Sequence, residues 1–308
     1  MLEENELRIM ATLDSPKKRR ALATELGYEP GTITNAVVHL EKLGLVTRER
    51  VGNETIIHPT SAKCLEVYQD LTATNSHVDF PELLTSSMLR VLYYLPADEP
   101  VSAAELAQRT EVSRATVYRT LKTLTNRAIA VKQGTRYHLT EQFSGLHKFA
   151  VELRHQHHRT QVQTDIGSGT LLWESYDEFI VRTDEGVDDS QYLLTGLDAF
   201  SEYGLQFFTR SGNYYFYSES RESLSSADLV CHPLLIENDA RHRKYAILLI
   251  TATNTSHEDV HKVATSYGVE DIISPLLTYL RTEGEQSSAQ TPPWSEMESL
   301  ARDYEVEI

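Results

Sequence analysis

Cationic and hydroxyl side chains recur at helical spacing between residues 113 and 136. Arg114 and Arg119 are the strongest candidates for base contacts, because an arginine guanidinium donates two parallel hydrogen bonds to a guanine edge. The serine that opens the run leaves helix amides free to bind a phosphate, and the cations beyond its end suit the DNA backbone. The pattern predicts a surface for double-stranded DNA, formed by Ser113, Arg114, Thr116, Arg119, Thr120, Thr123, Arg127, Lys132 and Arg136.

A second set of candidate DNA-binding residues lies nearer the N-terminus. Asn35 has the side chain that pairs with adenine, and four consecutive cations form the densest basic run in the chain. The set comprises Lys17, Lys18, Arg19, Arg20, Thr32, Thr34, Asn35, His39, Arg48 and Arg50. The sequence leaves open whether both sets contact DNA or only one of them.

The two sets belong to an internal repeat. Apolar residues recur with an offset of 84 residues, in the pairs Leu22/Leu106, Ile33/Val117, Leu40/Leu124 and Leu45/Ile129. Upstream the offset is 82, as between Leu7 and Leu89, which is explained by a difference of two residues in the intervening turn. The repeat predicts two domains with the same fold.

We expect the same order of elements in each copy: a helix, a short helix, a turn, a third helix and a hairpin. Ser15-Pro16 predicts the start of the second helix in the first copy, and Ser102 and Ser113 are the expected N-caps in the second. The predicted helices are 3–13, 15–26, 29–43, 103–109 and 114–127, and the predicted strands are 45–50, 54–59, 129–133 and 135–139. Helices are also expected at 61–74 and 141–159.

This order resembles the winged helix-turn-helix plan. The run from Ala104 to Leu124 is similar to the helix-turn-helix core of ArsR/MarR-like transcription regulators, and Leu22 to Val46 resembles it in the first copy. The resemblance covers residues 5–140. It implies two tandem winged-helix domains, mainly α with β-hairpin wings, whose third helices recognise DNA. The helix at 141–159 is expected either to pair with a second copy of the chain or to pack against its own domain.

The net charge of −16 is concentrated in the second half of the chain. Residues 1–160 hold 20 basic and 19 acidic side chains, whereas residues 161–308 hold 9 and 26. An evenly acidic protein would repel DNA, but the half that carries both candidate sets is nearly neutral. The chain has 9 Lys and 20 Arg. Few lysines among many acids are typical of proteins that work in concentrated salt, although an ordinary acidic protein fits equally well.

The second half is predicted to be an α+β domain. We expect a hairpin over 170–173 and 178–183, a helix over 193–203, a hairpin over 205–209 and 213–218, strands at 229–236 and 245–253, and helices at 257–267 and 271–281. The run from Thr195 to Leu205, followed by Tyr214–Tyr217, is similar to AbiEi-type antitoxin domains. The run from Leu172 to Phe179 resembles an uncharacterised regulator group of halophilic archaea. Neither resemblance implies catalytic residues.

One short motif matches a metalloprotease signature. His257, Glu258 and His261 form an H-E-x-x-H pattern, but they fall in the exposed first turns of their helix and lack an evident third ligand. The cluster His147, His155, His157 and His158 also lacks acidic or cysteine partners at ligand spacing. We expect no metal, no cofactor and no enzyme activity.

The expected domains are 1–75, 78–160, the acidic domain 165–282, and a linker with a short C-terminal helix over 283–308. No secretory signal or apolar run of 18 residues is present, so we expect a cytoplasmic protein without a membrane partner. The sequence predicts a transcription regulator that binds DNA as a homodimer, with the acidic domain open to a protein partner or small ligand.

Two alternatives to this function remain. One is an AbiEi-like antitoxin that represses its own operon and neutralises a nucleotidyltransferase-like toxin. The other is an adaptor whose winged helices bind proteins, which would be favoured if the two recognition faces were buried against each other.

Overall fold

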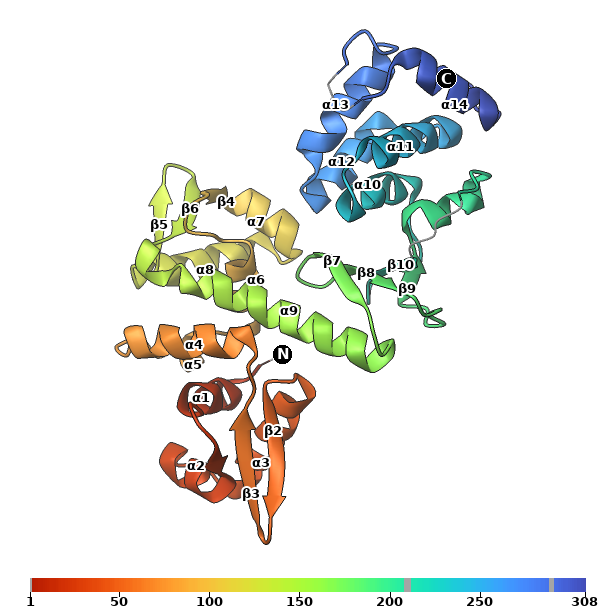
Figure 1. Cartoon of the computed structure of the whole chain (residues 1–308). Helices are drawn as coiled ribbons and strands as arrows, with labels where there is room; N and C mark the ends of the chain where they lie inside the picture. The colour runs from red at the N-terminus through yellow and green to blue at the C-terminus, as the bar shows by residue number, and fades with distance from the viewer. Residues whose placement is uncertain (1, 208–211, 288–290) are drawn as a thin grey trace. The chain divides into compact units, whose positions relative to one another are not determined.

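The computed structural model describes residues 2–207, 212–287 and 291–308. Its contacts divide the chain into two compact units, unit 1 (Met1–Gln161) and unit 2 (Val162–Ile308). Both combine helices with small antiparallel sheets, so the fold class is α+β, as predicted (Figure 1). Among the described residues, no helix is both long and apolar enough to cross a membrane.

Unit 1 contains the same succession of elements twice. The first copy consists of α1 (Glu4–Thr12), β1 (Lys17–Lys18), α2 (Arg19–Leu26), α3 (Pro30–Lys42), β2 (Val46–Val51) and β3 (Glu54–Pro59). The second consists of α6 (Ser86–Tyr93), β4 (Val101–Ser102), α7 (Ala103–Thr110), α8 (Arg114–Asn126), β5 (Ala130–Gln133) and β6 (Arg136–Leu139). Their sheets have the equivalent strand orders β1-β3-β2 and β4-β6-β5. The offset of 84 residues holds for the start of each element from β1 to β2.

The helix starts agree with the predictions except for the second helix of the first copy. Ser102 and Ser113 cap α7 and α8, their hydroxyl oxygens accepting from the amides of Glu105 and Thr116 at 3.2 Å each. The predicted helix start at Ser15-Pro16 is wrong, because Lys17 and Lys18 form β1 beside β3 and α2 begins only at Arg19. A strand of two residues is too short to show the alternating pattern that predicts a strand.

One hydrophobic core joins the two copies. It is completed by α4 (Lys63–Thr74), α5 (Phe80–Leu83), the 3-10 helix η1 (Glu141–Phe143) and the first part of α9 (Gly145–Asp165). The rings of Tyr68 in α4 and Phe149 in α9 lie 4.8 Å apart between centroids. Arg8 of α1 pairs with Asp79, the N-cap of α5, at 3.0 Å. The two copies therefore form a single packed body.

α9 also holds the end of α3. The Gln156 Nε2 and Thr160 Oγ1 atoms donate to the carbonyl oxygen of Leu43 at 3.2 and 3.3 Å. Gly44 follows with a φ of +68°, and a Cβ atom there would lie 2.7 Å from Gln156 Nε2. The left-handed backbone therefore favours glycine at this position, and a side chain there would have to displace the Gln156 amide.

Unit 2 contains a four-stranded antiparallel sheet in the order β7-β8-β10-β9. Its strands are β7 (Thr170–Glu174), β8 (Phe179–Thr183), β9 (Tyr192–Leu194) and β10 (Asn213–Tyr217). The predicted hairpin of β7 and β8 is present. Ile180 and Phe216 pack against helices on one face, whereas Phe179 and Tyr217 belong to a separate apolar cluster with Val162. Because side chains alternate along a strand, these clusters occupy opposite faces of the sheet.

The helices of unit 2 are η2 (Gly196–Tyr203), α10 (Ser226–Ile236), α11 (Ala240–Thr253), α12 (His257–Tyr267), α13 (Glu270–Arg281) and α14 (Trp294–Asp303). The strands predicted at 229–236 and 245–253 are wrong, since these runs lie in α10 and α11. Residues 229–234 and 246–250 are buried throughout. A helix buried on all sides shows no polar face and has no helical period to distinguish it from a strand.

The segment before β10 also differs from its prediction. The helix expected over 193–203 is split into β9 and the 3-10 helix η2, which ends at Gly204 as expected. Residues 205–207 form no strand, and the remainder of the predicted strand, together with most of its turn, lies outside the described residues. β10 pairs instead with β8 and β9.

Replacing Gly44 with alanine should lower the free energy of unfolding of unit 1 by about 2 kcal/mol. Alanine is strained at this φ and would displace the Gln156 amide from the Leu43 carbonyl. Gly27→Ala is the matched control, because Gly27 also has a φ of +68° but nothing within 4 Å of a Cβ atom, so about 1 kcal/mol is expected.

Urea unfolding followed by far-ultraviolet circular dichroism measures this difference. Both tryptophans, Trp173 and Trp294, lie in unit 2, so their fluorescence reports the transition of that unit separately. Equal losses in the two variants would contradict the role assigned to α9.

Candidate nucleic-acid interface

The outer face of α8 is cationic and carries no acidic residue. Val117, Leu121 and Leu124 are buried in the core of unit 1. The opposite side exposes Arg114, Ala115, Tyr118, Arg119 and Lys122. Helix residues four apart share a face, so Arg114, Tyr118 and Lys122 form one stripe, which we call the α8 stripe.

The cations of this face have no acidic partner among the described residues. Arg119 Nη2 donates to the hydroxyl of Thr116 at 3.2 Å. In the part of the chain that the structure describes, the side chains of Arg114 and Lys122 form no hydrogen bond or ion pair. These charges are fully available to an anionic partner, which need not break an ion pair to reach them.

The β5–β6 hairpin contributes two further predicted cations. Lys132 Nζ lies 5.6 Å from the ring centroid of Tyr137. Arg136 pairs with Glu105 at 3.0 Å and donates to the carbonyl of Pro100 at 2.7 Å. The Ser102 amide donates to Glu105 and holds the pKa of that carboxyl below its usual range, so Glu105 remains a counter-ion for Arg136.

Among the predicted hydroxyl residues of the second copy, Thr120 is misplaced. We expected it on the exposed face, but its exposed fraction is only 6%, because it lies on the inner side next to Leu121 and Leu124. Its counterpart in the first copy, Ala36, is buried as well. Thr123 is half-buried and donates to the carbonyl of Arg119 at 3.0 Å, whereas Arg127 is exposed at the C-cap of α8.

Two exposed residues of α8 were missed by the sequence analysis. Tyr118 is exposed over 56% of its surface and Lys122 is also exposed. Both follow Arg114 at steps of four residues, so the spacing of the α8 stripe was the signal that could have found them.

Three of the six predicted cations of the first copy are paired with acids. The pairs are Lys17–Glu25 at 3.0 Å, Lys18–Glu54 at 2.6 Å and Arg48–Glu41 with Nε and Oε2 2.8 Å apart. Arg20 is exposed, and Arg50 donates only to the carbonyl of Gly52 at 3.4 Å. Lys17 and Lys18 lie on β1 and not on the predicted helix. Half of the predicted cations of the first copy are therefore engaged in ion pairs, whereas no ion pair of Arg114, Arg119 or Lys122 occurs among the described residues.

The remaining candidates of the first copy lie on or beside α3. Asn35 is exposed. Thr34 donates to the carbonyl of Pro30 at 2.8 Å and accepts from Arg19 at 3.0 Å, and Thr32 is half-buried. The His39 ring lies 2.6 Å from a carboxylate oxygen of the buried Glu6 on α1, so its Nδ1 atom is engaged within the protein.

The H-E-x-x-H motif lies in a surface hollow. His257, Glu258 and His261 line a space of about 380 Å³ together with Ser274, Leu277, Thr278 and Arg281. The guanidinium of Arg281 places a positive charge in the same hollow, which disfavours a metal cation there. On α9, Arg154 contacts ring nitrogens of His157 and His158 at 2.9 and 3.2 Å, so these nitrogens are occupied.

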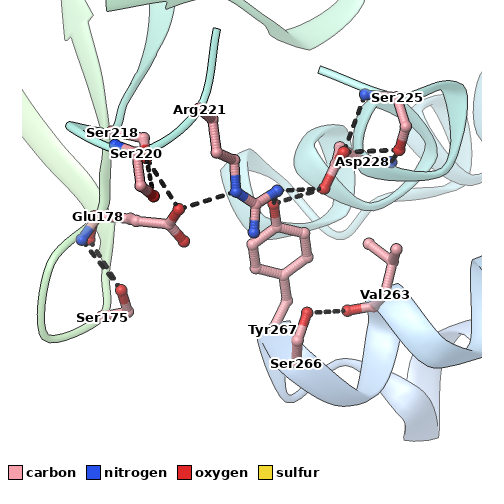
Figure 2. A network of polar contacts seen from close by, with 10 residues as sticks. All are labelled: Ser175, Glu178, Ser218, Ser220, Arg221, Ser225, Asp228, Val263, Ser266 and Tyr267. Carbon is pink, nitrogen blue, oxygen red and sulfur yellow. Dashed lines mark hydrogen bonds and ion pairs between the residues drawn. The ribbon is translucent and has the colours of Figure 1, made fainter. Parts of the chain in front are cut away.

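A half-buried ionic network connects the sheet of unit 2 to its helices. Figure 2 shows Arg221 between the carboxylates of Glu178 and Asp228, at 2.9 and 2.8 Å. The Tyr267 hydroxyl donates to the same Asp228 oxygen at 2.8 Å, and Ser225 donates to the other one. Every charged group in this cluster is paired inside unit 2, so the cluster serves the packing of β8 against α10 and α12.

Opposing effects act on the acid at the centre of this network. Burial alone would raise the pKa of Asp228, but hydrogen bonds from Ser225 and Tyr267 and the charge of Arg221 hold it below its usual range.

His232, stacked on Phe216 with ring centroids 4.7 Å apart, is fully buried, which lowers its pKa to about 3. His232 is therefore neutral over the physiological range.

The ionic network predicts how the stability of unit 2 depends on pH. The pKa of Asp228 is lower in the folded than in the unfolded state, so its contribution is present above an unfolded pKa of about 3.9 and is lost as the pH falls through the folded value. Asp228→Asn should lower the free energy of unfolding of unit 2 by about 2 kcal/mol at neutral pH. It should also make the loss of stability at low pH less steep.

Urea unfolding at several pH values, followed by tryptophan fluorescence, measures the effect. Asp271→Asn, at an exposed acid of α13, is the control and should keep the wild-type pH dependence. If the free energy of unfolding of Asp228→Asn fell at low pH as steeply as that of the wild type, the role given to Asp228 would be refuted.

Two segments of the chain are similar to known domain families. Residues 189–306 match the family model HVO_2833_C, described as C-terminal, and residues 82–147 match the HVO_A0261 N-terminal domain. Both are haloarchaeal families of unknown function. None of the curated proteins matches the chain. The two matched segments cover α8 with its hairpin and most of unit 2, and neither family description names an activity.

Proposed function

We propose that this protein is a sequence-specific DNA-binding transcription regulator that reads the major groove with α8. The observation that carries the proposal is the exposed, acid-free cationic face of this helix. DNA offers a dense row of phosphates and guanine edges, for which arginine and lysine are the matching side chains.

The architecture around α8 supports the same function. In each copy three helices precede a hairpin whose second strand pairs with a further short strand, and this arrangement agrees with the winged helix-turn-helix plan. In that plan α8 is the recognition helix and β5–β6 is the wing. The Ser113 cap and the amides of the first turn of α8 then face a phosphate.

The exposure of both third helices favours DNA over a protein-docking adaptor. Arg114, Tyr118 and Lys122 on α8, and Asn35 on α3, are all exposed in unit 1, whereas the adaptor alternative would be favoured by faces buried against each other. We assign base reading to α8. The first copy is assigned a supporting role through Arg20 and Arg50, because glutamates already pair with three of its other cations.

Three expectations about partners stay predictions. They are the homodimer on a pseudo-palindromic site, the protein or ligand partner of the acidic domain, and the AbiEi-like alternative. For the dimer, α9 already buries Leu146, Phe149 and Ala150 in the core of its own unit, so this stretch is not free to pair with a second chain.

Removing cations from α8 should weaken DNA binding. We expect Arg114→Ala and Arg119→Ala each to lower the affinity for a duplex that the wild-type protein selects from a random library. The expected loss is roughly 5- to 150-fold, because one bidentate base contact contributes about 1–3 kcal/mol. Lys122→Ala should weaken all duplexes alike and reduce the salt slope by about one. Fluorescence anisotropy on duplexes selected from a random library, titrated across salt, measures both effects.

Lys262→Ala is the matched control, because it removes one exposed cation from α12 of unit 2 and leaves unit 1 unaltered. Its affinity should equal that of the wild type. Enrichment of no sequence by the wild-type protein, or equal affinities for the three α8 variants and the wild type, would overturn the proposed function.

A further inference from the structure

The centre of the α8 stripe is an aromatic ring. Tyr118 is exposed over 56% of its surface, and no hydrogen bond of its hydroxyl occurs among the residues that the structure describes. One turn before it lies Arg114 and one turn after it lies Lys122, and neither forms an ion pair with any residue that the structure describes. An exposed aromatic ring gains free energy when another apolar group covers it.

The major groove offers one apolar group to such a ring. Base edges there present hydrogen-bond donors and acceptors, except for the C5-methyl group of thymine. In a helix-turn-helix the N-terminal part of the recognition helix meets these edges, and Tyr118 is the fifth residue of α8. The position and the chemistry of Tyr118 therefore agree on the same contact.

We propose that Tyr118 packs against a thymine methyl group and so selects thymine at one position of the binding site. The inference rests on the proposed function and specifies the sequence that α8 reads. Residues one turn apart are separated by about 5.4 Å along a helix, which corresponds to one or two base steps of about 3.4 Å. The selected thymine therefore lies within two base pairs of the guanine bound by Arg114.

The first copy has no aromatic ring at the equivalent position. The residue 84 positions before Tyr118 is Thr34, whose hydroxyl is engaged with Pro30 and Arg19. The ring contact is therefore specific to α8.

The experiment replaces thymine with deoxyuridine, which differs only by the methyl group. Duplexes enriched by the full chain from a random library are resynthesised with each thymine replaced in turn, and the affinities of the wild type, Tyr118→Ala and Tyr118→Phe are measured. At one position the replacement should weaken the wild type about fourfold, the worth of one buried methyl group. Tyr118→Phe should keep this preference, and Tyr118→Ala should lose it.

Arg114→Ala is the matched control, because it should weaken binding and yet keep the preference for thymine over uracil. An enriched sequence in which every thymine can be replaced without loss would overturn the inference alone. So would a Tyr118→Phe variant that loses the preference, since the hydroxyl and not the ring would then make the contact. The absence of any enriched sequence would overturn the proposed function and the inference together.

Discussion

Burial of one apolar stripe on each of α3 and α8 determines which of their side chains remain on the surface. Ile33, Val37 and Leu40 are buried on α3, and their repeat partners Val117, Leu121 and Leu124 are buried on α8. Each buried side chain of this kind contributes about 1.5–3 kcal/mol, whereas a surface ion pair contributes about 0–1 kcal/mol. The core therefore fixes the rotation of both helices, and the outer residues differ between the copies at little cost to the fold.

That freedom accounts for the difference between the two outer faces. At equivalent positions α3 has Pro30, Thr34, Asn35 and Val38 where α8 has Arg114, Tyr118, Arg119 and Lys122. The first copy has cations elsewhere, on β1 and β2, but glutamates on the neighbouring elements pair with three of them. Two copies of one scaffold thus present different chemistry, and only α8 combines free cations with an exposed aromatic ring.

The sequence predicts unit 1 far better than unit 2, and the reason is physical. In unit 1 the helices are half-buried, so their apolar residues recur at 3.6-residue spacing, and the repeat doubles each signal. This spacing predicts the exposed face of α8, except at Thr120, which we expected on that face. The apolar Ala36 at the equivalent position of the first copy is buried and indicates that Thr120 is buried too. In unit 2, α10 and α11 are buried all round, so their β-branched, apolar runs are indistinguishable from strands. Ion pairs such as Lys18–Glu54 join residues far apart in the chain and leave no local pattern to read.

The position of charges, and not their sum, decides whether an acidic chain can bind DNA. A net charge of −16 acts at long range, and salt screens it over about 10 Å at 0.1 M and about 3 Å at 1 M. The proposed contacts between α8 and a base edge are about 3–4 Å long, which is well below the screening length at 0.1 M and comparable with it at 1 M, although salt still weakens binding through counter-ion release. Under concentrated salt, hydrogen bonds from arginine and apolar contacts from Tyr118 therefore contribute a growing share of the affinity. The proposed interface relies on both, which suits a protein whose second half carries most of its acids.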